Sequence, residues 1–181
     1  MLEIRESAEQ DLTGLLVVEE TAFGDTEGPV IVELVKGLLQ DPTAIPLLSL
    51  VALSDQRIVG HILFSKAEVT GFAEEQSSIL APLAVEPDFQ NRGIGSSLVT
   101  EGLKLLAEAG VKMVFVLGHP EYYPRFGFKP AGQYGLDAPY PIPEAVKEAW
   151  MVQELSPGYI GRVKGPVKCA ETLDHPEHWR E

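Results

Sequence analysis

Two glycines, Gly93 and Gly95, have the type and the spacing that could hold an anion. They follow an apolar run that ends at Val85 and precede an apolar-periodic segment that begins near Ile94, as in a strand, a turn and a helix. Because glycine lacks a Cβ, the backbone there can come close to a ligand and turn its N–H groups outward. The start of the helix adds the positive end of its dipole, so the pattern predicts a site for phosphate or pyrophosphate.

Two well-known phosphate loops do not fit these residues. A nucleoside triphosphate loop needs a lysine after its second glycine, and here Gly95 is followed by Ser96 and Ser97. A dinucleotide loop needs a small residue where Leu98 stands and an acidic residue about 20 positions later, where residues 114–117 are apolar. The sequence therefore argues against both classes of ligand.

The loop resembles the pyrophosphate loop of another class of protein. The pattern Gln90-x-x-Gly93-x-Gly95, after a strand that ends in Val85, is similar to the coenzyme A loop of the GNAT superfamily of N-acetyltransferases. An ordinary strand-to-helix turn with two glycines is the alternative interpretation of the loop alone. A second motif argues against it, because Tyr123, Gly127 and Phe128 match the Tyr-x-x-x-Gly-Phe element of that superfamily in order and spacing.

The resemblance implies acetyl-CoA as the acyl-donor cosubstrate. The pantetheine arm is then expected between the strand ending at Val85 and the strand at 113–117, and the Val85 N–H is expected to stabilise the oxyanion of the reacting thioester. The residues that the resemblance and the loop together place at the cofactor are Leu83, Ala84, Val85, Gln90, Asn91, Arg92, Gly93, Ile94, Gly95, Ser96, His119, Tyr122, Tyr123 and Phe126.

A tyrosine pair could supply the proton that the coenzyme A thiolate needs. A phenol with an ordinary pKa of about 10 stays protonated at neutral pH. Tyr122 and Tyr123 are adjacent on a short helix, so they point in different directions. The register with Gly127 favours Tyr123 as the general acid and leaves Tyr122 to packing or to a cofactor contact, while Phe126 and Phe128 read as core aromatics.

The base that deprotonates an amine acceptor is less clearly marked. Glu19, Glu20, Glu86 and His119 are candidates, and a water chain without a dedicated base is an alternative. Glu19 and Glu20 lie near the end of the first predicted helix, and the loop after this helix borders the acceptor cleft in GNAT proteins. We assign Glu20 as the catalytic candidate.

Composition limits the remaining function classes. The chain has 181 residues, 45% of them hydrophobic, and a net charge of −13, which suits one domain with a sizeable core. Nucleic acid and anionic membranes are disfavoured, because both need clustered cations, and the acidity favours a cationic ligand. Cys169 is the single cysteine and has only His175 and His178 nearby, so neither a disulfide nor a metal site is expected. The amino terminus lacks an apolar signal segment, so we expect a cytoplasmic protein.

The pattern of elements predicts a mixed α+β fold. A strand at 2–5 precedes a helix opened by a capping box of Ser7 and Gln10, and residues 24–29 are expected to break this helix. The further segments expected are a helical segment at 30–39 ended by Asp41-Pro42, a hairpin of strands at 47–53 and 58–69, a strand at 78–85, a helix from Ile94 to Glu108 capped by Gly110, a strand at 113–117, a short tyrosine-bearing helix and a final strand at 150–155.

This order resembles the GNAT fold over nearly all of residues 1–130, a mixed and mostly antiparallel sheet with flanking helices. We expect one acetyltransferase domain at 1–170, in which 131–170 completes the sheet and site, followed by a loose tail at 171–181. Residues 131–143 are expected to form an ordered loop over the site or a mobile lid.

The expected activity is transfer of an acetyl group from acetyl-CoA to an amine-bearing small molecule or peptide, with neither nucleic acid nor membrane as a partner and with dimerisation left open. A non-catalytic acyl-CoA-binding regulatory module and an acyltransferase with a longer acyl donor are the alternatives.

Overall fold

The computed structural model describes residues 1–180 and contains nine strands there. They run in the order β1-β2-β3-β4-β5-β8-β6, with β9 paired to β3 and β7 paired to β9. The strands are β1 (Leu2–Glu6), β2 (Leu48–Ser54), β3 (Arg57–Val69), β4 (Ser77–Val85), β5 (Met113–Leu117), β6 (Lys129–Pro130), β7 (Leu136–Asp137), β8 (Trp150–Glu154) and β9 (Gly165–Cys169). The helices are α1 (Leu12–Gln40), α2 (Ile94–Glu108) and the short 3-10 turns η1 (Glu9–Asp11), η2 (Pro42–Ala44), η3 (Pro87–Phe89), η4 (Tyr123–Phe126), η5 (Gly132–Tyr134), η6 (Glu144–Ala149) and η7 (Pro176–Trp179).

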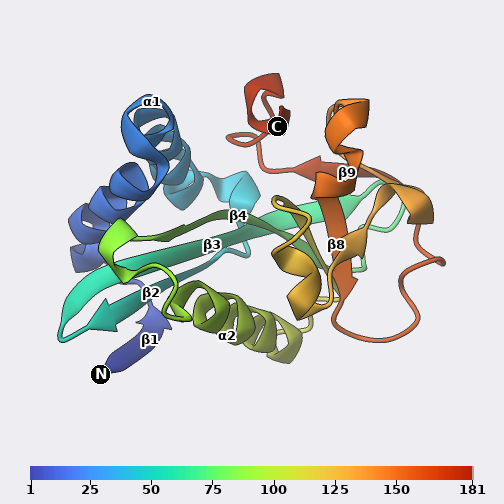
Figure 1. Ribbon diagram of the computed structural model, residues 1–181. Helices are drawn as coiled ribbons and strands as arrows, with labels where there is room; N and C mark the ends of the chain where they lie inside the picture. The colour runs from blue at the N-terminus through green and yellow to red at the C-terminus, as the bar shows by residue number, and fades with distance from the viewer. Residues whose placement is uncertain (181) are drawn as a thin grey trace.

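The sheet is covered on both faces. Helix α1 and the C-terminal segment lie over one face and α2 lies over the other (Figure 1). Alternation along β3 explains this, because Ile62 and Phe64 pack with α2 while Leu63 and Ala67 pack with the second half of α1. The mixed α+β sheet expected from the pattern of elements is therefore present.

Helix α1 is bent at a single residue. Gly24 has φ +85° and ψ −177°, and the helix resumes directly after it rather than at residue 30. At Gly28 a Cβ would lie 2.6 Å from the backbone oxygen of Glu20, so the two halves of α1 pack too closely there for any side chain. The predicted break at 24–29 is thus confined to Gly24.

The predicted capping box of Ser7 and Gln10 is not formed. Instead the Asp11 carboxylate accepts a hydrogen bond from the Ala8 N–H at 2.7 Å. Ser7 is engaged elsewhere, because its hydroxyl donates to the Ser49 hydroxyl on β2 at 2.7 Å. The predicted hairpin is present, and Asp55 and Gln56, with φ of 50° and 70°, form its two-residue turn.

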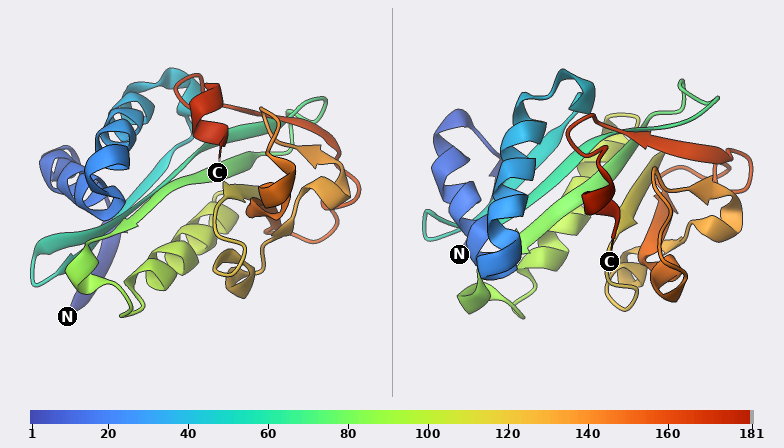
Figure 2. Two further views of the ribbon diagram at one scale, coloured as in Figure 1. Left: turned by 45° about the horizontal axis from the view of Figure 1, so that its top comes forward. Right: turned by 90° about the horizontal axis from the view of Figure 1, so that it is seen from above.

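The C-terminal part is more ordered than the sequence suggested. Strand β9 pairs with the end of β3, so β8 is not the final strand. The segment after it packs against the sheet beside α1 (Figure 2), with Leu173 and Trp179 only 3% and 2% exposed. Residues 171–180 are therefore not a loose tail, and residue 181 lies outside the described residues. In the expected loop at 131–143, Ala131 and Leu136 are fully buried, so this segment is an ordered part of the structure.

One carboxylate fastens the C-terminal segment to the end of α1. Asp41 Oδ1 accepts from the N–H and hydroxyl of Thr43, and Oδ2 accepts from those of Thr172, at 2.6–2.9 Å. Desolvation alone would raise the pKa of Asp41, but these four hydrogen bonds outweigh it and lower the pKa to about 2. We call this arrangement the Asp41 clamp.

Candidate active site

The two central strands separate along their length. β4 and β5 are parallel and pair from Ser77 with Met113 to Leu80 with Val116. Beyond Leu80, β4 continues to Val85 paired only with β3 on its other side. The second half of β4 therefore has a free edge that faces the gap toward β5.

The backbone of Val85 is turned toward this free edge. The N–H of Glu86 donates to the Val59 oxygen at 2.9 Å, so Glu86 directs its backbone groups at β3. Because these groups alternate along an antiparallel ladder, the N–H and C=O of Val85 and of Leu83 point the other way. The Gln90 side chain donates to the Val85 oxygen at 3.0 Å, in agreement with this orientation. The Val85 N–H is thus presented to the gap between β4 and β5.

The glycine loop leaves several backbone donors without helical partners. Gly93 has φ +83° and is the N-cap of α2, and the Ser97 N–H makes the first helical bond, to the Gly93 oxygen at 3.0 Å. The N–H groups of residues 93–96 precede this bond, and no side chain among residues 1–180 caps the helix. The start of α2 is therefore a ready site for an anion.

At Gly95 the glycine loop comes close to β4 and to Tyr122. A Cβ built on Gly95 would lie 3.0 Å from the Tyr122 hydroxyl, 3.7 Å from a methyl of Val85 and 3.9 Å from a methyl of Leu83. Predicted cofactor residues from β4, from the start of α2 and from the position just before η4 thus converge around one glycine.

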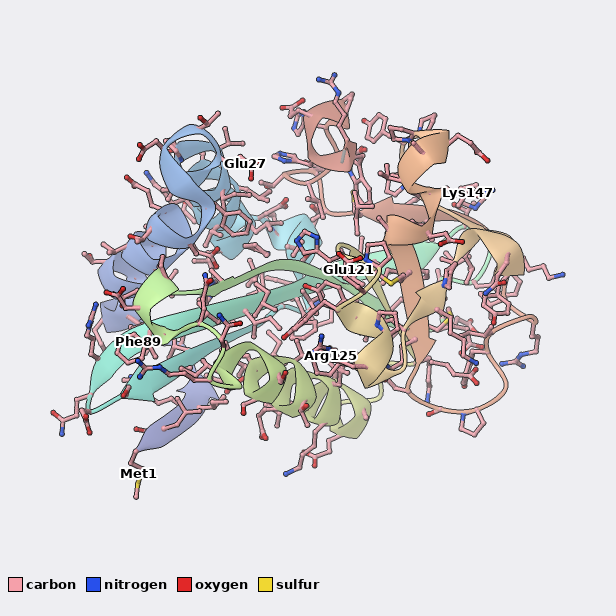
Figure 3. The ribbon with its side chains drawn as sticks, in the orientation of Figure 1. Met1, Glu27, Phe89, Glu121, Arg125 and Lys147 are labelled. Atoms are coloured by element: carbon pink, nitrogen blue, oxygen red, sulfur yellow. The ribbon has the colours of Figure 1, made fainter. Side chains whose placement is uncertain are left out.

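Two arginines add positive charge to this part of an otherwise acidic chain. The Arg92 guanidinium lies 5.0 Å from the centre of the Phe89 ring, and the Arg125 guanidinium lies 4.5 Å from the centre of the Tyr122 ring. In the view of Figure 3, Phe89 and Arg125 lie on opposite sides of the start of α2. Salt screens charges beyond about 10 Å, so an anion here would be influenced mainly by charges close to it and less by the net charge of the whole chain.

The two tyrosines occupy different environments. Tyr122 is half-buried, with its hydroxyl near Gly95. Tyr123 is 7% exposed and packs its ring against Gly118 at the end of β5 and, edge-on, against Phe128. The N–H groups of both tyrosines donate to the His119 oxygen, which holds the turn at the end of β5.

The remaining predicted residues are dispersed. Asn91 lies on the loop, Ser96 lies in the first turn of α2, and Phe126 packs edge-on against Tyr122. Ile94 and Ala84 are buried, so Ile94 offers the site only its backbone. Of the four base candidates, His119 and Glu20 are exposed, and Glu86 forms an ion pair with Arg57.

The fourth base candidate, Glu19, belongs to a buried network that the sequence did not predict. Its Oε2 lies 2.5 Å from Nδ1 of His61 on β3, and Nε2 of His61 lies 2.9 Å from the hydroxyl of Ser49 on β2. Glu19 and His61 are both 0% exposed. Burial raises the pKa of Glu19, and the hydrogen bond and charge of His61 oppose this rise. The one sequence signal that could have indicated this network was a histidine, His61, inside the apolar strand predicted at 58–69.

Two other properties bear on ligands. Residues 1–180 contain no group of three His, Cys, Asp or Glu side chains placed to hold a metal ion. Within the same residues, neither long helix is apolar enough to cross a membrane.

Comparisons with known proteins point to one family and one fold. The acetyltransferase (GNAT) family model matches residues 15–128. Over 163 residues the chain is 44% identical to YjhQ, an uncharacterized N-acetyltransferase of Escherichia coli strain K12, which covers 89% of this chain and 88% of that protein.

Solved structures show the same fold. The crystal structure of the GNAT family N-acetyltransferase YhbS from Escherichia coli in complex with CoA has a TM-score of 0.86 and 30% identity, covering 96% of this chain and 92% of that one. A GNAT family acetyltransferase from Brucella melitensis in complex with acetyl-CoA has a TM-score of 0.76 and 30% identity, covering 96% and 99%. The fold expected from the sequence resemblance is confirmed.

Proposed function

The chain belongs to the acetyltransferase (GNAT) family, and from that premise we propose that it transfers an acetyl group from acetyl-CoA to a primary amine. The observation that carries the proposal is the convergence at Gly95 of the free edge of β4, the unpaired donors of α2 and the Tyr122 hydroxyl. The E. coli and Brucella proteins to which the chain is similar were crystallised with CoA and acetyl-CoA. This arrangement suits a pyrophosphate at the start of α2 and a pantetheine arm in the gap beside β4.

The chemistry assigned to the chain is direct attack. The lone pair of the amine attacks the thioester carbonyl carbon, and the Val85 N–H donates to the oxyanion that forms. The C–S bond then breaks and the thiolate takes a proton from Tyr123. The attacking nitrogen loses one N–H proton as it becomes an amide, and this proton, passed through water, restores the Tyr123 phenol. Tyr123 is chosen over Tyr122 because it has the register of the family motif and lies against Gly118, at the end of the strand that borders the gap. The acceptor class is an amine-bearing small molecule or peptide.

The direct test is release of free thiol from acetyl-CoA in the presence of amines. The panel contains spermidine, L-lysine, benzylamine and a peptide with a free α-amino group, and mass spectrometry of the products reports a gain of one acetyl group. Propionyl-CoA and octanoyl-CoA, measured in parallel, distinguish a longer acyl donor. Tight acetyl-CoA binding in calorimetry without turnover of any amine would favour the non-catalytic binding module and contradict the proposal.

A further inference from the structure

A continuous chain of hydrogen bonds ends on the carboxylate of Glu19, on the side of α1 that faces the sheet. The Ser7 hydroxyl donates to the Ser49 hydroxyl at 2.7 Å, and the Ser49 hydroxyl lies 2.9 Å from His61 Nε2. His61 Nδ1 in turn lies 2.5 Å from Glu19 Oε2. With Nδ1 protonated, every group in this chain donates toward Glu19, so the chain favours the ionised carboxylate and fixes its orientation.

The second oxygen of this carboxylate is left over. Glu19 Oε1 is buried and has no hydrogen-bond partner among residues 1–180. Burying a carboxylate oxygen is costly unless a hydrogen-bond donor replaces its contacts with water. A group that brings its own N–H donors and a positive charge would remove this cost, and a primary ammonium has both.

The network lies next to the strand that borders the gap. His61 is directly opposite Ala84 in the register of β3 and β4, and Ala84 precedes Val85, whose N–H faces the free edge. Neighbouring strands are about 4.8 Å apart, and α1, which carries Glu19, packs over both β3 and β4. Glu19 is on the face covered by α1, whereas the anion site at the start of α2 is on the other face (Figure 1). Donor and acceptor would therefore approach the gap from opposite faces.

We propose that Glu19 Oε1 binds the ammonium group of the acceptor and is the base that deprotonates it, an inference that rests on the proposed acetyl transfer. An N–H bond of the ammonium breaks as the O–H bond of Glu19 forms, and the freed lone pair attacks the thioester carbon. The proton returns to water when the acetylated product leaves. Glu19 thus takes the place that the sequence assigned to Glu20, which is exposed on α1. His61, Ser49 and Ser7 are positioning residues that act through Glu19.

The environment of Glu19 suits a base. Burial raises its pKa above the ordinary value of 4.5, which brings it closer to neutral pH and makes it a stronger proton acceptor. Among the described residues, His61 on β3 is the titratable group in hydrogen-bond contact with it. Behind His61 lie the neutral hydroxyls of Ser49 on β2 and of Ser7, which follows β1. Because the base must be ionised, turnover falls as the pH drops through the raised pKa of Glu19.

The test compares kcat against pH for Glu19→Gln and for a matched control, Glu27→Gln. Glu27 lies on the same helix, just after the bend at Gly24, and is exposed; in Figure 3 it lies on the side of α1 away from α2. The assay uses the amine from the panel with the fastest turnover and a second amine whose ammonium group has a different pKa. If the fall of kcat at low pH came from protonation of the acceptor, this acidic limb of the profile would move between the two amines. We expect Glu19→Gln to lose about 10²-fold or more in kcat and to lose the acidic limb, with acetyl-CoA affinity within twofold of the parent. Glu27→Gln should retain both the rate and the limb.

Two further variants keep the test decisive if Glu19→Gln does not fold. Ser49→Ala removes a donor to His61 and weakens the support of the anion, so its acidic limb should move to higher pH while its plateau rate stays within tenfold. Glu19→Asp should keep a limb at a reduced rate. A parental rate and limb in a folded Glu19 variant, an unmoved limb in Ser49→Ala, or a loss that falls on Glu20→Gln instead would overturn the inference alone. Absence of turnover by the unmodified protein would overturn the proposed function as well.

Discussion

Gly95→Val is predicted to remove coenzyme A binding from a protein that still folds. Gly95 has an ordinary helical backbone, since its φ is not positive, so a side chain is tolerated there by the dihedral angles. What the side chain meets is the site itself, because its Cβ would lie 3.0 Å from the Tyr122 hydroxyl and 3.7 Å from Val85. The two valine methyls extend further into the space beside the free N–H groups of α2.

The magnitude follows from the donors that would be blocked. A hydrogen bond to a charged group contributes about 1.5–3 kcal/mol. A pyrophosphate displaced by the methyls loses about two such bonds, or roughly 3–6 kcal/mol, which corresponds to a loss of about 10²–10⁴ in affinity. Folding changes little by comparison, because valine has a helix propensity only a few tenths of a kcal/mol better than glycine. A change of this size moves the melting temperature by roughly 2 °C or less.

Calorimetric titration with acetyl-CoA measures the first quantity, and thermal melting measures the second. Gly132→Val is the matched control, since a Cβ on Gly132 has no neighbour within 4 Å among the described residues and its φ is not positive. Parental affinity for acetyl-CoA in a folded Gly95→Val protein would refute the assignment of the loop and of the start of α2 to the cofactor.

Other perturbations separate chemistry from packing. Tyr123→Phe should lower kcat by about 10²-fold with acetyl-CoA affinity retained, while Tyr122→Phe should change kcat little. If steady-state rates show the larger loss in Tyr122→Phe, the general acid is Tyr122 instead. The contribution of Asp41 to stability is present above its ordinary pKa of 3.8 and is lost as the pH falls toward the folded-state pKa of about 2. Urea midpoints of the parent should therefore fall more steeply over this pH window than those of Asp41→Asn. Equal slopes for the two proteins would contradict the Asp41 clamp. Burial raises the pKa of Cys169 to about 12, so iodoacetamide at pH 8 should label the native protein far more slowly than the urea-unfolded chain, and similar labelling rates would show the thiol to be accessible.

The sequence was sufficient where one element carries its own signal. Helix α2 and strand β5 have the predicted bounds, Ile94–Glu108 and Met113–Leu117, because an apolar period between glycines fixes both ends of the helix and an apolar run fixes the strand. The backbone geometry of the glycine loop was predictable for the same reason, since its glycines and the start of α2 are contiguous; its role in cofactor binding stays a prediction.

Features made by distant residues were not predictable in this way. Glu19 and His61 are 42 positions apart, and before the fold is known a glutamate on a helix looks like a solvated side chain. Ser7 looked like a helix cap because local spacing cannot show that Ser49 competes for its hydroxyl. The tail looked polar because Leu173 and Trp179 are its only large apolar residues after Cys169, yet both are buried against the sheet.

The pairing of β9 with β3 has a consequence for synthesis of the chain. β3 is 13 residues long, and its end, from Ala67 to Val69, is covered on one edge by residues made about a hundred positions later. While the ribosome is still extending the chain, this buried, apolar edge is open to pairing with other nascent chains. A product that terminates before Gly165 would keep the loop and both tyrosines yet retain that open edge. Premature termination would therefore yield aggregates rather than a smaller working enzyme.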